Sequence, residues 1–208
     1  MCIRDRTDWT PVVMELVTQV LDTQLDEGSG LCLRQIPLAD RLPELEFHFP
    51  VARLDPGTLR AALADTPYAG SAEGLGFEPL RGLMRGFIDL VLRHRGRYYL
   101  VDYKSNLLGR HLAAYGQDGM AAAIREHRYD LQYLIYTLAM HRFLGARLPD
   151  YDYERDFGGV FYLFLRGMRP ALGPRYGVWH DRPSRRLVQR LDHLFGGTGQ
   201  GQGQGEAA

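Results

Sequence analysis

The feature that most constrains this fold is a pair of apolar segments separated by only two residues. Segments 84–94 (MRGFIDLVLRH) and 97–104 (RYYLVDYK) have the composition of strands, and Arg95-Gly96 stands between them. A two-residue connection that contains glycine is typical of a tight β-hairpin, because the turns that suit the twist of the strands need positive φ. The sequence therefore predicts two adjacent antiparallel strands near the middle of the chain.

The turn also predicts which residues face one another. If Arg95 and Gly96 are its two central residues, Asp89 stands opposite Asp102 and Phe87 stands opposite Lys104. Side chains alternate along a strand, so Asp102 and Lys104 share one face, and paired residues have Cβ atoms about 4.5–5.5 Å apart. This register predicts two carboxylates side by side with a lysine next to them. A three-residue turn would shift the register by one residue and break the pair.

Two facing carboxylates repel each other and raise one pKa, so a structure that keeps them usually places a cation between them. Mg²⁺ fits, because it takes oxygen ligands and is commonly held by one or two carboxylates together with substrate phosphates. Such a metal polarises a phosphoryl oxygen and lowers the pKa of a bound water, while a nearby lysine donates to the developing charge. The pattern favours a phosphodiesterase; an ordinary hairpin with exposed charges is the alternative.

Composition supports this interpretation in two ways. The 208 residues include 24 arginines and a single lysine, Lys104, which suggests a position where a guanidinium does not serve. The net charge is zero, yet residues 1–80 carry −7 and residues 81–208 carry +7. A basic C-terminal portion fits a polyanionic partner, with a solvated basic surface as the alternative. The sequence contains neither a Walker A loop nor a dinucleotide-binding glycine pattern, which argues against ATP or NAD binding in the usual ways.

The remaining segments predict an α/β chain with three regions. Residues 1–43 form an N-terminal helical segment, residues 44–195 the main domain, and residues 196–208 a Gly/Gln-rich tail that we expect to be disordered. The first six residues, MCIRDR, match nothing that follows and resemble a translated adapter sequence, so we expect the gene to begin further upstream. No apolar run approaches the length of a membrane span, and we expect no membrane partner. Periodicity predicts helices at 9–26, 56–64, 118–144 and 184–195, and further strands at 44–52, 157–166 and 176–180.

Three stretches resemble the nuclease core of the RecB family, a branch of the PD-(D/E)XK nucleases: GFIDLVLRHRGRYYLVDYKSNLLG, EHRYDLQYLIYTLAMHRFL and YDYERDFGGVFYLFLRGM. The resemblance covers about residues 44–195 and implies a restriction-endonuclease-like core, with a mixed central sheet flanked by helices. It implies an Mg²⁺-dependent DNA nuclease domain of a RecBCD-type helicase–nuclease, which processes linear double-stranded DNA ends for recombinational repair. It further implies RecC-like and RecD-like partner subunits and a location in the bacterial cytoplasm.

The same resemblance assigns roles at the hairpin. Asp89 matches the first metal-binding aspartate and Asp102 the second, and the backbone carbonyl of Tyr103 is an expected further ligand. Lys104 matches the catalytic lysine. The expected cofactor is one Mg²⁺ per active site, with two as the alternative.

A second motif and one departure complete the resemblance. Gln132 and Tyr136 match a Gln-x-x-x-Tyr helix motif that faces the active site and the DNA; ordinary core packing is the alternative for this pair. The family also uses a histidine on an upstream helix, which has no counterpart before residue 44, and His48 lies in a predicted strand. We therefore expect weaker metal binding by this chain alone. A nuclease-like module that serves DNA binding or subunit contact without catalysis is the competing hypothesis.

Overall fold

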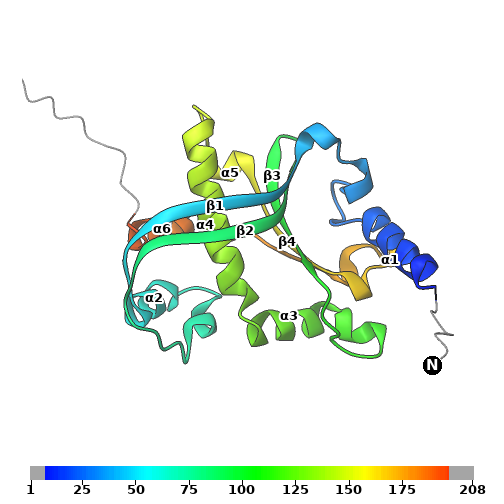
Figure 1. Cartoon of the computed structure of the whole chain (residues 1–208), viewed down its shortest axis with the longest axis horizontal. Coiled ribbons are helices and arrows are strands. Elements are labelled where there is room, and N and C mark those ends of the chain that lie inside the picture. Colours follow the sequence, from blue (N-terminus) through cyan, green and yellow to red (C-terminus); the bar gives the residue numbers. More distant parts are fainter. Residues whose placement is uncertain (1–7, 197–208) are drawn as a thin grey trace, which may run out of the picture.

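The computed structural model describes residues 8–196, and a five-stranded sheet runs through these residues (Figure 1). Neighbouring strands are antiparallel except for the third and fourth, which are parallel. The prediction of an α/β chain with a mixed sheet and a central antiparallel hairpin is therefore confirmed. The strands lie in chain order across the sheet: β1 (Arg41–Leu54), β2 (Leu80–His94), β3 (Arg97–Lys104), β4 (Phe157–Phe164) and β5 (Val178–Asp181).

The turn between β2 and β3 has the predicted form. Arg95 and Gly96 have φ values of 48° and 79°, as a two-residue turn with two left-handed positions requires. The ladder pairs His94 with Arg97 and continues to Leu90 opposite Val101. The register predicted from the sequence is thus confirmed over five residue pairs.

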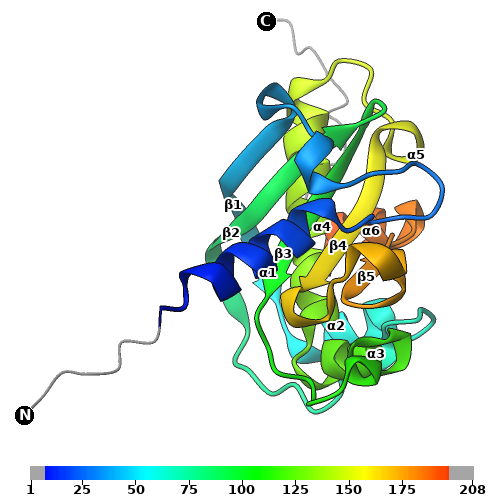
Figure 2. The same cartoon turned by 90° about the vertical axis from the view of Figure 1, so that its right-hand side faces the viewer.

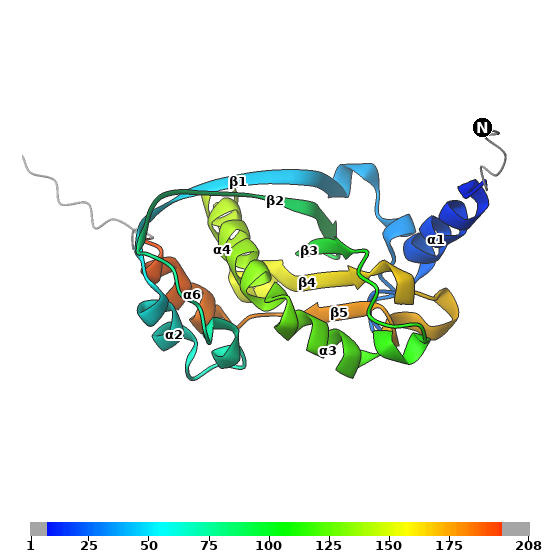
Figure 3. The same ribbon diagram turned by 60° about the horizontal axis from the view of Figure 1, so that its bottom comes forward.

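Strands β1 and β2 form a long antiparallel ribbon that extends past the shorter strands and curves over one end of the helical layer (Figure 1, Figure 3). One face of the ribbon is buried by Phe47, Phe49 and Val51, which alternate with exposed residues along β1. Alternation of this kind is expected for a strand with one face on the core and one in solvent. The predicted strand at 44–52 is correct in type but shorter than β1.

Six α-helices accompany the sheet within residues 8–196: α1 (Thr10–Asp22), α2 (Pro56–Leu63), α3 (Gln117–Glu126), α4 (Tyr129–Arg147), α5 (Tyr153–Asp156) and α6 (Arg185–Leu194). Buried residues from α2, α3, α4 and α6 join one core cluster with the sheet. The second cluster lies on the other face, where the end of α1 and residues 25–36 pack against β2, β3 and β4 (Figure 2). None of these helices has both the length and the apolar character that a membrane crossing requires.

The prediction of one long helix over 118–144 is wrong, because the chain breaks between α3 and α4. Arg128 adopts a left-handed backbone conformation with φ 53°, which a continuous α-helix does not allow. Its guanidinium donates to the backbone carbonyls of Ser71 and Glu73 at 3.0 and 2.9 Å, and the Ser71 hydroxyl donates to Asp130. Contacts from a segment more than 50 residues away therefore hold the break in place.

Helix α1 also differs from expectation. Its apolar residues recur at helical spacing, yet Val12 and Val13 are more than half exposed and only Val20 is buried. The physical reason is that the first turns of α1 extend beyond the sheet and only its last turn reaches the core (Figure 2, Figure 3). The predictions for residues 1–6 and for the tail fall outside the described residues, except at Gly196.

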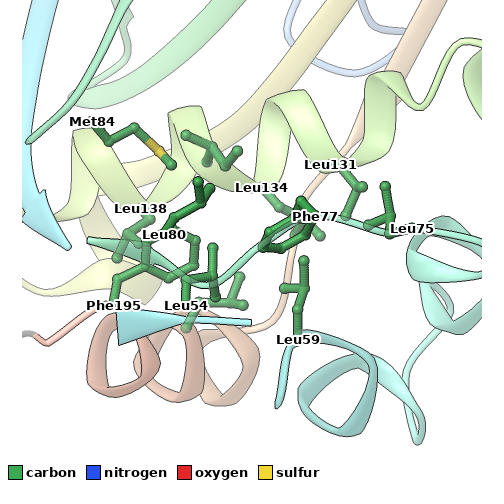
Figure 4. A pocket seen from close by; sticks show the side chains of 12 residues that line it. Leu54, Leu59, Leu75, Phe77, Leu80, Met84, Leu131, Leu134, Leu138 and Phe195 are labelled. Carbon is green, nitrogen blue, oxygen red and sulfur yellow. The ribbon is translucent and has the colours of Figure 1, made fainter. Parts of the chain in front are cut away.

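An apolar cavity of about 200 Å³ lies between the far end of the β1–β2 ribbon and the helices (Figure 4). Leu54 of β1, Leu80 and Met84 of β2, and Leu138 of α4 contribute to its wall. All twelve lining side chains are apolar, so the cavity lacks the acids, bases and polar donors that phosphodiester chemistry needs. The candidate site lies elsewhere, at the hairpin.

Candidate active site

The two aspartates lie just beyond the last pair of the β2–β3 ladder. Continuing its register by one residue places Asp89 opposite Asp102, but the strands separate there and Asp89 Oδ2 instead accepts a hydrogen bond of 2.9 Å from the Tyr103 backbone N–H. The expectation that Phe87 stands opposite Lys104 is wrong, because Phe87 pairs only with Glu46 on β1 and is half exposed. The hydrogen bond from Tyr103 fixes the Asp89 carboxylate against the edge of β3.

Asp102 is a buried carboxylate that contacts Lys104. The residue is 5% exposed, and burial raises the pKa of its carboxyl group, opposed by Lys104 and assisted by the negative charge of Asp89. Lys104 Nζ lies 2.5 Å from Asp102 Oδ1 and is the cationic partner of that oxygen. Burying this carboxylate beside a second one is costly, and a divalent cation would offset the repulsion between Asp89 and Asp102.

Lys104 lies where β3 meets α4. Its ammonium donates to Gln132 Oε1 at 3.0 Å and contacts the Asp102 carboxylate. The faces of two aromatic rings are close as well, with centroids 4.0 Å away for Tyr129 and 4.9 Å away for Tyr162. The lysine is therefore held by a carboxylate, an amide and two π faces, all near the end of its side chain.

Gln132 connects this group to Tyr136. The Gln132 Oε1 atom also accepts from the Tyr162 hydroxyl at 3.0 Å, and Nε2 donates to the Tyr136 hydroxyl at 2.8 Å. The Tyr136 ring packs edge-on against Phe47 of β1, and burial raises the pKa of its hydroxyl. The structure thus brings the predicted pair Gln132 and Tyr136 to the two carboxylates and the lysine.

The donor set fits a hard divalent cation. The Asp102 carboxylate, the second oxygen of Asp89 and backbone oxygens are ligands of the kind that Mg²⁺ takes. Within the residues that the structure describes, no group of three His, Cys, Asp or Glu side chains could hold a metal. A cation here would therefore complete its shell with backbone carbonyls, water or substrate oxygens.

Two titratable side chains of the predicted strand at 44–52 are exposed on β1. His48 is exposed on β1 opposite Arg85, as expected for a surface strand residue. Glu46 is also exposed, and its carboxylate pairs with Arg85 Nε at 2.6 Å. Tyr103 is 38% exposed, so only its backbone remains a candidate ligand.

Sequence reasoning missed Tyr129 and Tyr162. Tyr129 lies three residues before Gln132 on α4, so helical spacing could have placed it on the same face. Tyr162 lies on β4, where it pairs with Asp102 in the parallel ladder. That pairing depends on a long crossover between β3 and β4, and no local signal in the sequence fixes its register.

The comparison with protein families is consistent with this geometry. The model of the PD-(D/E)XK nuclease superfamily matches residues 15–195. The chain belongs to the PD-(D/E)XK nuclease superfamily. Nucleases of this superfamily generally use divalent metal ions.

The curated relatives of this nuclease domain include three bacterial proteins of the same name. It is 46% identical over 197 residues to RecBCD enzyme subunit RecB of Escherichia coli K12, and this alignment covers 92% of the chain and 16% of the relative. For the same subunit of Haemophilus influenzae Rd the identity is 44% over 188 residues, 90% of the chain and 15% of the relative. The Mycobacterium tuberculosis H37Rv subunit is 40% identical over 221 residues, 92% of the chain and 20% of the relative. The chain thus spans about a sixth of the length of the first two relatives.

Proposed function

We propose that this chain is the Mg²⁺-dependent DNA nuclease domain of a RecBCD-type helicase–nuclease that degrades and processes linear double-stranded DNA ends for recombinational repair. The observation that carries the proposal is the contact between the only lysine of the chain and the buried Asp102, with Asp89 beside it. The similarity to RecB subunits supports DNA as the substrate and RecC-like and RecD-like subunits as partners. We also infer the cytoplasmic location expected from the sequence.

In this proposal Asp89, Asp102 and the Tyr103 carbonyl hold the metal ion. When bound, the ion polarises a phosphoryl oxygen and lowers the pKa of a coordinated water. Lys104 contributes a donor to the attacking water or to the charge that develops on the phosphate. Gln132 keeps the ammonium in place through its 3.0 Å hydrogen bond, and Tyr136 fixes the orientation of the Gln132 amide.

Charge near the site supports a polyanionic substrate. The exposed Arg166 follows β4, and its Nε donates to the backbone carbonyl of Ser105, directly after the proposed catalytic lysine, at 2.9 Å. Arg110 is also exposed, in the loop that leaves β3. Phosphate contacts by arginine make binding to DNA dependent on salt, so DNA binding by this chain should weaken as ionic strength rises.

Degradation of linear duplex DNA with Mg²⁺ and with EDTA tests the proposal. We expect cleavage by the unchanged chain with Mg²⁺ only, and a rate about 10²–10³-fold lower for Lys104→Ala, because a donor to the transition state is lost. Lys104→Arg should be similarly impaired, because a planar guanidinium cannot replace a compact ammonium. The control variant Glu46→Gln, which removes an exposed carboxylate, should cut normally.

Two results would reject the assignment. Equal rates for the unchanged chain and Lys104→Ala would mean that the lysine has no catalytic role. Binding of linear DNA without any Mg²⁺-dependent cleavage would instead favour the competing hypothesis, a nuclease-like module that binds DNA or contacts another subunit.

A further inference from the structure

The end of Lys104 is enclosed by aromatic residues that belong neither to the proposed metal site nor to the Gln-x-x-x-Tyr motif. Tyr129 and Tyr162 present their rings to the ammonium at 4.0 and 4.9 Å, and their own centroids lie 5.7 Å apart. The Tyr162 ring is fixed by packing, since the residue is 1% exposed and contacts Tyr133 edge-on. We refer to Tyr129, Tyr162 and Gln132 as the lysine cage.

Hydrogen bonds fix the cage in one arrangement. The Tyr129 hydroxyl donates to Asn106 Oδ1 at 3.2 Å, and the Tyr162 hydroxyl donates to the same Gln132 oxygen that accepts from Lys104. The ammonium donates to Gln132 Oε1 and contacts Asp102 Oδ1 at 2.5 Å. An ammonium has three N–H groups, so at least one remains for a substrate oxygen or a water.

We propose that Tyr129 and Tyr162 are positioning residues for Lys104, whose ring faces hold the ammonium between Asp102 and Gln132 with a donor free for the reaction. This inference rests on the proposed nuclease function and extends it to residues outside the metal site and the Gln-x-x-x-Tyr motif. A cation over an aromatic face is stabilised without using any of its N–H groups, which a carboxylate or amide cannot achieve.

The single lysine makes a direct test of the cage possible without metal or substrate. Labelling the chain with ¹³C-lysine gives NMR signals from Lys104 alone. Protons above the face of an aromatic ring are shielded, so the Hε protons of Lys104 should lie upfield of those in free lysine. The displacement should persist in Tyr129→Phe, which keeps the ring, and shrink in Tyr129→Leu, which removes it.

Cleavage kinetics provide the second readout. We expect Tyr129→Leu to lower kcat about tenfold at unchanged KM, because the ammonium loses one ring face but the DNA contacts remain. Tyr129→Phe should restore kcat to within about twofold, since the hydroxyl donates only to Asn106. Tyr162→Phe removes the hydroxyl that helps to orient Gln132, so it should lower kcat while the Hε displacement persists.

The outcomes separate the two proposals. Hε protons at the free-lysine position in the unchanged chain, or a Tyr129→Leu variant with unchanged Hε shift and kcat, would overturn the cage. If the unchanged chain fails to cut DNA with Mg²⁺, the nuclease proposal fails, while the NMR comparison still decides whether the rings hold Lys104. Melting temperatures of all three variants show whether a lost signal reflects unfolding.

Discussion

At the scale of single residues, the site is a buried ion pair that the metal-free chain holds at a cost. Asp102 and Lys104 are both largely buried, and burial raises the pKa of Asp102 despite the nearby ammonium. Buried pairs of this kind seldom contribute much net stability, because removing both charges from water offsets their attraction. The pair is therefore better explained by what it can bind than by what it stabilises.

The raised pKa of Asp102 gives a prediction for the metal-free chain. The folded state binds a proton at Asp102 more tightly than the unfolded state does, because the pKa of the carboxyl is higher in the folded chain. The free energy of unfolding therefore falls as pH rises through the unfolded pKa of 3.8 toward the folded pKa. Without metal, Asp102→Asn should therefore have a higher free energy of unfolding than the unchanged chain at pH 7. Urea unfolding in EDTA at about pH 7 and about pH 3.5 measures this difference, which should shrink at the lower pH.

Added Mg²⁺ provides the matching control for that variant. It should stabilise the unchanged chain and leave Asp102→Asn nearly unaffected, because a ligand that binds only the folded state stabilises it by mass action. A less stable Asp102→Asn in EDTA at neutral pH would show that the ion pair with Lys104 outweighs the cost of burying the carboxylate.

The residues of the site differ in how far the sequence could predict them. The sequence could predict that Asp89, Asp102 and Lys104 lie close together, because one tight turn sets their register over a few residues. The position of Tyr162 depends on the parallel pairing of β3 with β4, which the tertiary fold decides. The sequence could not predict that the strands separate at Asp89 either. There the backbone N–H of Tyr103 donates to the Asp89 side chain in place of a ladder hydrogen bond.

At the scale of elements, the β1–β2 ribbon supports α4 from one side. Phe47 of β1 lies over Gly86 of β2, and its ring packs against Tyr136. A β-carbon at Gly86 would lie 2.5 Å from Phe47 Cζ, so this close approach requires glycine. The contact links the ribbon to Tyr136 and, through Gln132, to the lysine.

We therefore expect Gly86→Ala to affect both stability and the site. The added methyl group would push Phe47 away from the ribbon, which should cost about 1–3 kcal/mol of stability, as overpacked cores do. It should also shift the Lys104 NMR signal, since Phe47 contacts Tyr136. The control Gly70→Ala adds a methyl group where no atom lies within 4 Å and should change stability by less than about 0.5 kcal/mol. Equal stabilities of the two variants would contradict the role given to this contact.

The elements also show where pattern reading stops. Strands and helices with strong periodicity were found at nearly the right positions, whereas the break between α3 and α4 was not. Residues 118–144 are rich in Ala and Leu on both sides of the break, and the contacts of Arg128 with Ser71 and Glu73 hold the interruption in place. Such contacts join segments that are distant in the sequence, so no local window contains them.

At the scale of the whole molecule, the sheet separates two cores, and the site lies on the face that α4 covers. Leu100 packs on that face, and strand alternation places Asp102 and Lys104 on it as well. Helix α1 and residues 25–36 cover the other face around β3 and add no side chain to the site. The sheet and α4 thus hold the carboxylates, lysine and amide from two different elements, which favours a fixed site geometry.

The central claim is that Asp89 and Asp102 together bind a divalent metal ion. Calorimetric titration of Mg²⁺ into the chain, the two variants Asp89→Asn and Asp102→Asn, and the surface control Glu46→Gln measures this directly. We predict saturable binding by the unchanged chain and by Glu46→Gln, and its loss in both aspartate variants. Binding by Asp89→Asn and Asp102→Asn that equals binding by the unchanged chain would contradict the account.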